Sequence, residues 1–322
     1  GQKGGEPGVS GWEHFWRAPD PDVIAVVLGT AVGLITRILL LRSDYRQYPA
    51  YPHGRLIHLS LGLIAGALGA LAVPALMAEQ YTAITFLSLA AQQFREVRNM
   101  ERNTLRAIDG QELVPRGDSY IEGIAVVFEG RNYVVMLAAF FVSLLSVWIG
   151  WWAGVAAGAA VLPATRLLMR GRRVADIADI SFAPVRTDDA GVYVGDIYMM
   201  NVGLEADREL IRQAGVGLVL VPKNDDARVT LAHAGQRQAI LYDLSARLGV
   251  YRDEGEPALL PQAKLDLATG RVGVLALARE RDRDKVLAAV RNVPLLEAAV
   301  RHPARANRKR KEQGRWEKSS PS

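Results

Sequence analysis

Apolar residues are concentrated in the first half of the chain, in stretches long enough to cross a bilayer. Residues 23–41 and 56–77 each approach the roughly 20 apolar residues that a transmembrane helix requires. Residues 133–169 are too many for one crossing, because a helix rises about 1.5 Å per residue and the hydrocarbon core is about 30 Å thick. We expect this stretch to form two helices that turn near Gly150, beside a cluster of tryptophans of the kind found at membrane interfaces.

A shorter apolar segment at residues 81–91 continues into a polar stretch with helical periodicity at 92–108. Arginine placement indicates whether the short segment crosses, because positively charged loops stay on the cytoplasmic side. Arginines occur between the first two spans and again before the fourth, at Arg42, Arg46, Arg55, Arg95, Arg98, Arg102, Arg106, Arg116 and Arg131. Both loops can be cytoplasmic only if residues 81–91 cross. The pattern therefore predicts about five spans in the cell membrane, with the N-terminus outside and the C-terminal domain in the cytoplasm.

After Arg173 the pattern changes to short alternating strands and helices. Strands are expected at 180–185, 192–200, 216–221, 265–267 and 272–278, a loop at 223–226, and helices at 204–213, 236–248 and 282–291. A mixture of this kind predicts a small α+β domain with a core of its own.

The predicted fold class is thus a membrane all-α part of about five transmembrane helices followed by a small cytoplasmic α+β domain. We expect a flexible N-terminus at residues 1–20 and a transmembrane domain at 21–170 that carries a cytoplasmic segment at 95–131. The α+β domain would occupy 171–300, and a basic disordered tail 301–322.

Composition removes several classes of site. The 322 residues include no cysteine, which excludes disulfides, thiolate zinc sites, iron–sulfur clusters and a cysteine nucleophile. The five histidines are far apart and form no HExxH pair, so no metal site is expected. Phosphate-binding, dinucleotide-binding and nucleophile-elbow motifs are missing from the sequence, and no cofactor is expected.

The net charge of +5 comes largely from the tail. Basic tails contact nucleic acid or anionic lipid, or are simply solvated. On a membrane protein we favour lipid contact or disorder, and we expect no nucleic-acid partner. Small residues spaced for helix contact form GxxxG pairs at Gly29/Gly33, Gly62/Gly66 and Gly154/Gly158. Packing within one chain is the favoured interpretation of these pairs, and a homodimer interface is the alternative.

Acidic residues lie beside the membrane at Asp118, Glu122 and Glu129. In a helix these positions share one face, because successive residues are about 100° apart. The functional interpretation is a carboxylate site with a raised pKa that moves a proton or holds a cation. The alternative, which we favour, is ion pairing with nearby arginines, namely Arg98, Arg102, Arg106 or Arg131.

Between these acids lies the string Tyr120-Ile121-Glu122-Gly123-Ile124-Ala125. The chain resembles the YIEGIA family, membrane proteins of endospore-forming Firmicutes named for that string. The resemblance covers about residues 20–300 and includes the run Gly195-Asp196-Ile197-Tyr198-Met199-Met200-Asn201. It implies a sporulation-linked membrane role and a small capping-type protein subunit as partner, but no defined reaction.

A looser likeness is to the sporulation aspartic protease that processes a sigma-factor precursor, which also has about five spans and a cytoplasmic domain. Such enzymes use two carboxylates that share a proton, usually in Asp-Thr/Ser-Gly turns. Asp189 precedes Ala-Gly and lacks the hydroxyl residue, whereas Asp118 precedes Ser-Tyr and lacks the glycine. The catalytic candidates are Asp118, Glu122, Asp189 and Asp196. The leading hypothesis is a sporulation-linked scaffold or regulator whose cytoplasmic domain binds a protein partner, and a membrane-tethered aspartic-type protease is the alternative.

Overall fold

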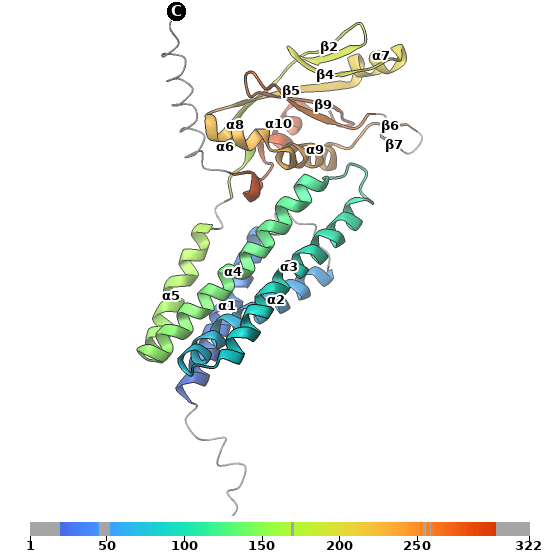
Figure 1. The fold of residues 1–322 in the computed structure, drawn as a ribbon. Coiled ribbons are helices and arrows are strands. Elements are labelled where there is room, and N and C mark those ends of the chain that lie inside the picture. The colour runs from blue at the N-terminus through green and yellow to red at the C-terminus, as the bar shows by residue number, and fades with distance from the viewer. Residues whose placement is uncertain (1–19, 45–51, 169–170, 254–255, 258, 301–322) are drawn as a thin grey trace, which may run out of the picture. The chain divides into compact units, whose positions relative to one another are not determined.

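A computed structural model describes residues 20–44, 52–168, 171–253, 256–257 and 259–300 (Figure 1). The predicted flexible N-terminus and the predicted basic tail lie outside these residues, except for residue 20. Contacts divide the described chain into two compact units. The first unit contains residues 20–42, 52–94 and 131–168, and the second contains 43–44, 95–130 and 171–300.

The first half of the chain is helical, as its apolar stretches predict. The helices are α1 (Pro21–Asp44), α2 (Pro52–Met77), α3 (Tyr81–Asp109), α4 (Asp118–Trp148) and α5 (Trp151–Leu168). Three described stretches are long and apolar enough to cross a membrane, and they are Pro21–Arg42, Gly54–Met77 and Asp118–Trp148. The apolar part of α5, Trp151–Thr165, is shorter. The predicted turn lies between α4 and α5, where Gly150 has a φ of 133° that a residue with a side chain rarely adopts.

Small residues let the helices of the first unit approach closely. A Cβ atom added to Gly33 of α1 would lie 2.9 Å from the Cα atom of Gly66 on α2. All the glycines of the predicted GxxxG pairs face another helix of this same unit. The structure therefore supports the packing interpretation of these pairs, and the homodimer stays a prediction without support from them.

Arg37 is buried in the first unit, although a place near a helix end suggests that its charge reaches the headgroups. Its side chain is fully buried, and its Nη2 atom lies 3.0 Å from Nδ1 of His58 on α2. Gly62, one turn further along α2, leaves room for the aliphatic stem of Arg37. The imidazole of His58 contacts the guanidinium and Gly62 makes room for the stem, so the arginine is accommodated inside the bundle.

The C-terminal part of the second unit is an α+β domain, as predicted. Its four-stranded antiparallel sheet has the order β1 (Ala178–Phe182), β5 (Gly215–Pro222), β9 (Val272–Leu277), β8 (Gln262–Leu265). A three-stranded sheet contains β2 (Val185–Asp188), β3 (Gly191–Val194) and β4 (Ile197–Asn201), and a short pair contains β6 (Arg252–Asp253) and β7 (Glu256–Pro257). The helices are α6 (Val174–Ile177), α7 (Glu205–Ala214), α8 (Asp225–Ala232), α9 (Ala234–Leu248), α10 (Arg283–Arg291) and the 3₁₀ turn η1 (Glu297–Ala299).

Both faces of the four-stranded sheet are covered, so its central strands are apolar throughout. All six residues of β9 are buried. On one face, β3, β4 and α7 pack against β5 and β9 around Val194, Ile211 and Leu275. Helices α8, α9 and α10 lie against the other face (Figure 1). Burial on both faces explains why β5 and β9 read as continuous apolar runs instead of alternating patterns.

Four predicted boundaries in this domain are wrong. The strand expected at 265–267 overlaps β8 only at Leu265, and residues 267–269 form the turn to β9. The strand expected at 180–185 is two strands, because β1 joins β5 while β2 begins a separate hairpin. The strand expected at 192–200 is broken at Gly195, whose φ of 62° makes a tight turn between β3 and β4. The loop expected at 223–226 contains the start of α8, where the Asn224 side chain accepts a hydrogen bond from the backbone N–H of Ala227 at 2.8 Å.

Candidate functional site

The six-residue string Tyr120–Ala125 lies in the first turns of α4, within the second unit. Four of its side chains are buried, with exposures of 7% or less: Tyr120, Ile121, Ile124 and Ala125. Glu122 and Gly123 instead line a groove. The string thus combines an apolar face that packs with one partly exposed acidic side chain, that of Glu122.

Arginines of α3 bind the acidic face of α4. Arg98 donates from Nη2 to Glu122 Oε1 at 2.6 Å and from Nη1 to Glu129 Oε2 at 2.9 Å. Arg102 Nη1 lies 3.4 Å from Glu122 Oε2, and Arg106 Nε donates to Asp118 Oδ1 at 2.7 Å. The structure therefore shows ion pairing of these acids with Arg98, Arg102 and Arg106.

The spacing of these charges explains the match. The three arginines follow one another at intervals of four residues and so lie on one side of α3. The acids share one side of α4 for the same reason. Hydrogen bonds with Glu129 and then Glu122 raise the pKa of Arg98 above its ordinary value, so this guanidinium stays charged. Because the side chains are partly exposed, each ion pair adds little stability alone. Together, the ion pairs between the two helices mainly fix the register of α3 against α4.

A second polar cluster holds the start of α4 on α9. The carboxylate of Asp109, at the end of α3, accepts the backbone N–H groups of Arg116 at 2.7 Å and Gly117 at 2.9 Å. The Arg116 guanidinium lies 3.7 Å from the centre of the Tyr242 ring on α9. The Tyr242 hydroxyl in turn donates to Glu112 at 3.4 Å. These contacts tie the α3–α4 connection to the α+β domain.

Close backbone packing strengthens the same contact. A Cβ atom added to Gly235, at the start of α9, would lie 2.7 Å from the carbonyl oxygen of Ser119. Further along α9, burial raises the pKa of the Asp243 carboxyl group above the ordinary value, although the charges of Arg247 and Arg116 oppose this shift. The sequence gives no signal for this arrangement, because residues more than 100 positions apart along the chain form it.

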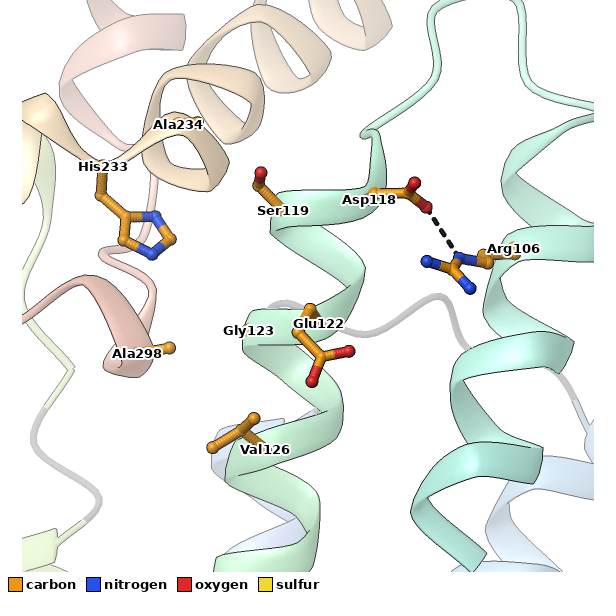
Figure 2. Close-up of a pocket in the computed structure, with 9 residues that line it drawn as sticks. All are labelled: Arg106, Asp118, Ser119, Glu122, Gly123, Val126, His233, Ala234 and Ala298. Atoms are coloured by element: carbon orange, nitrogen blue, oxygen red, sulfur yellow. Dashed lines mark hydrogen bonds and ion pairs between the residues drawn. The ribbon is translucent and has the colours of Figure 1, made fainter.

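The groove beside the string has a volume of about 610 Å³ (Figure 2). Its lining comes from α3, α4, the α8–α9 junction and η1: Arg106, Asp118, Ser119, Glu122, Gly123, Val126, His233, Ala234 and Ala298. Figure 2 shows the Asp118 carboxylate directed at Arg106, on the side of α4 away from His233. We name this cavity the motif groove. Its lining combines the charged side chains of Arg106, Asp118 and Glu122 with apolar surface from Val126, Ala234 and Ala298.

The four catalytic candidates are not gathered into one site. Asp118 and Glu122 line the motif groove, but each is bound to arginine. Asp189 lies in the β2–β3 turn with a φ of 47°, and Asp196 lies in the β3–β4 turn, so the two are at opposite ends of β3. Arg271 binds Asp196 at 2.6 Å and holds the pKa of that carboxyl group below its usual range. A proton-sharing pair needs two carboxylates about 3 Å apart, and ion pairing with separate arginines does not produce one.

Within the described ranges, no three histidine, aspartate or glutamate side chains are placed to hold a metal ion. The sequence did not indicate the role of Arg116, Tyr242 and Gly235, whose contacts hold the start of α4 against α9. The regular spacing of the arginines on α3 was the signal that the sequence did provide.

Comparison with known proteins agrees with the family resemblance that the six-residue string indicates. The family model described as YIEGIA protein matches residues 25–306. A Bacillus subtilis (strain 168) protein, described as uncharacterized protein YphB, is 49% identical over 281 residues, which cover 87% of this chain and 95% of that protein. No solved structure matches the chain significantly. The predicted resemblance is confirmed, and the chain belongs to the YIEGIA family.

Proposed function

We propose that the chain is a multi-pass protein of the cell membrane with about five spans, an outer N-terminus and a cytoplasmic α+β domain. The length and apolar character of α1, α2 and α4 support membrane insertion. Orientation rests on arginine placement, since the turns near Glu79 and Gly150 carry no lysine or arginine while the other loops do. In this topology the third span is the apolar first part of α3, residues 81–91, and the polar remainder of α3 lies on the cytoplasmic side.

The absence of cysteine makes this topology directly testable. Single cysteines at Gln80 and Trp151 should react with a membrane-impermeant maleimide in intact cells. Cysteines at Leu113 and Leu267 should react only after the membrane is permeabilised, because both positions would be cytoplasmic. All four positions are at least partly exposed in the structure. Labelling of positions 80 and 113 from the same side would show that α3 does not cross, and the five-span topology would then be wrong.

We further propose that the chain acts in spore formation or germination as a scaffold or regulator whose cytoplasmic domain binds a protein partner. One observation carries this proposal: the acidic face of the string is bound by arginines of α3, while the start of the same helix is bound by α9. A segment used in this way joins structural elements and leaves Asp118, Glu122 and Glu129 without the freedom that acid–base chemistry needs. The sporulation context and a small capping-type subunit as partner are expectations that the resemblance of the sequence to the family implies.

The test is purification of the tagged full chain from sporulating Bacillus subtilis in a mild detergent. A scaffold should bring a protein partner with it in a constant ratio, and membrane lipid should accompany both. A chain that emerges alone would count against the scaffold. If in addition asparagine at Asp118, Asp189 or Asp196 abolished spore formation at normal protein levels, the aspartic-type protease would become the better explanation.

A further inference from the structure

A second groove lies in the α+β domain, beside α7 and away from the string in sequence. Its volume is about 410 Å³. Its lining comes from the end of β4, the loop to α7, α7 itself, the segment before β8, and β9: Met200, Asn201, Val202, Gly203, Leu204, Asp207, Leu210, Ile211, Leu259 and Leu277. We name it the α7 groove. Met200 and Asn201 belong to the run 195–201, which lies within the residues that the family model matches.

The floor of the α7 groove is part of the domain core. Ile211 and Leu277 are each 2% exposed and belong to the main apolar cluster of the domain. Met200, Leu210 and Leu259 pack against that cluster while remaining partly accessible. An apolar side chain placed in the groove would therefore extend an existing core, which is a favourable way to bury apolar surface.

The wall of the groove is held in place before anything binds. Arg208 Nη1 donates to the carbonyl oxygens of Val202 at 2.8 Å and Gly203 at 3.0 Å. The backbone N–H of Val202 donates to the carbonyl oxygen of Ala190 at 2.7 Å. Because these bonds fix the loop between β4 and α7, binding here would cost little additional ordering of the chain.

Leu204, at the rim of the groove, is a residue type that the stability of α7 alone does not favour at this position. It is the N-cap of α7, has an extended backbone, makes no capping hydrogen bond with its side chain, and is 69% exposed. N-cap positions favour Ser, Thr, Asp or Asn, whose side chains satisfy the free N–H groups of the first turn. A leucine therefore forgoes capping and leaves a large apolar side chain in water. An apolar partner surface would give this choice a use.

The charge at the groove is equally specific. Asp207 is the one charged residue of the lining, and no ion pair or hydrogen bond joins its carboxylate to another side chain in the part of the chain that the structure describes. The neighbouring acids Glu205 and Glu209 are bound by Arg208 and Arg212. An apolar cavity with one uncompensated carboxylate at its edge complements an apolar segment that carries a cation beside its apolar residues.

We propose that the α7 groove docks an amphipathic basic helix of a partner protein, with a large apolar side chain in the cavity and a lysine or arginine next to Asp207. This is the helix-in-groove mode of recognition. The inference rests on the proposed scaffold function, because it names the surface at which the cytoplasmic domain would hold its partner.

Leu204→Asp separates docking from folding. Aspartate is a favoured N-cap and complements the helix dipole, so the variant should keep or raise the thermal midpoint of the full chain. It removes the apolar rim and should lose the partner in the purification from sporulating cells. Leu267→Asp is the matched control, because Leu267 is 80% exposed in the β8–β9 turn and does not line the groove.

Defined probes test the chemistry without a known partner. Two fluorescent peptides would share one amphipathic helical apolar face and differ only in having lysine or glutamate on the polar face. Binding to the full chain in nanodiscs of neutral lipid should favour the basic peptide by about tenfold. Leu204→Asp should reduce this binding about tenfold, and Asp207→Lys should reverse the preference between the two peptides.

The outcomes distinguish the groove from the scaffold. Loss of the partner with Leu204→Asp but not with Leu267→Asp, together with the peptide preference, supports the proposal. If all variants retain the partner, the groove proposal fails and the scaffold stands. If no variant brings a partner, the scaffold fails, and equal binding of both peptides would overturn the groove as well. A doubled mass that Leu204→Asp abolishes would make a second copy of the chain the occupant and also overturn the proposal.

Discussion

Arg116→Ala is expected to lower the free energy of unfolding of the second unit by about 3 kcal/mol, because removing one member of a buried ion pair leaves the other unpaired. The Arg116 and Asp109 side chains are only 9% and 8% exposed, with Nη1 and Oδ1 3.7 Å apart. Breaking a buried ion pair usually costs about 3–5 kcal/mol. Asp109 would keep its two backbone N–H donors, so we expect a loss at the lower end of that range. The same change removes the contact with the Tyr242 ring.

The measurement is the thermal midpoint of the full chain in detergent, where about 3 kcal/mol corresponds to a fall of roughly 6–12 °C for a unit of this size. Arg95→Ala is the control, because Arg95 is an exposed arginine on the same α3, and its loss should stay within about 0.5 kcal/mol. Arg116→Lys should recover only part of the loss, since an ammonium lacks the planar stacking surface. Equal midpoints for the two alanine variants would show that the buried cluster does not hold α4 on α9.

The features predictable from the sequence are those that depend on local order. Apolar runs of sufficient length predicted the helical half, and the arginine intervals on α3 together with the acids of α4 predicted the ion pairs. Both follow from the period of the α-helix, which is known before any tertiary contact is made. The family string was recognisable for the same reason, as a contiguous run of letters.

The features that escaped prediction depend on partners far along the chain. In the sequence, residues 180–185 read as one continuous strand. In the structure, β5 pairs only with the first part of this stretch, and Val185 begins a strand of a different sheet. Arg116 gives no sign in the sequence that Tyr242 will lie across its guanidinium. The sequence set residues 95–131 apart from the spans, but it gave no sign that contacts would group residues 95–130 with the α+β domain.

These contacts give the string a physical role that its letters alone do not. In the turns of α4 that carry the string, acidic side chains contact α3 and backbone atoms contact α9. A single helix therefore takes part in two interfaces. A change at either interface should therefore be felt at the other. The close packing of Gly235 against Ser119 is the place where that dependence can be measured most directly.

Gly235→Ala is expected to cost about 1–3 kcal/mol or more, because overpacking against atoms that cannot move away forces the helices apart. The added Cβ would lie 2.7 Å and 2.9 Å from the carbonyl oxygen and carbon of Ser119, and 3.0 Å from the backbone nitrogen of Tyr120. All three are main-chain atoms at the start of α4, so rotation of a side chain cannot relieve the contact. Separation of α9 from α4 is the response that remains.

Gly130→Ala is the matched control, because it makes the same substitution in another helix and is not expected to destabilise the protein. Gly130 is inside α4, and no heavy atom beyond the adjacent backbone of its own helix lies within 4 Å of its added Cβ. Alanine should therefore leave stability unchanged or raise it by up to about 1 kcal/mol through helix propensity. Thermal midpoints and the rate of proteolysis in the α3–α4 connection report both variants. If Gly235→Ala is as stable and as protected as Gly130→Ala, the close approach of α9 to the string is wrong, and with it the role of the string in joining α3 to the α+β domain.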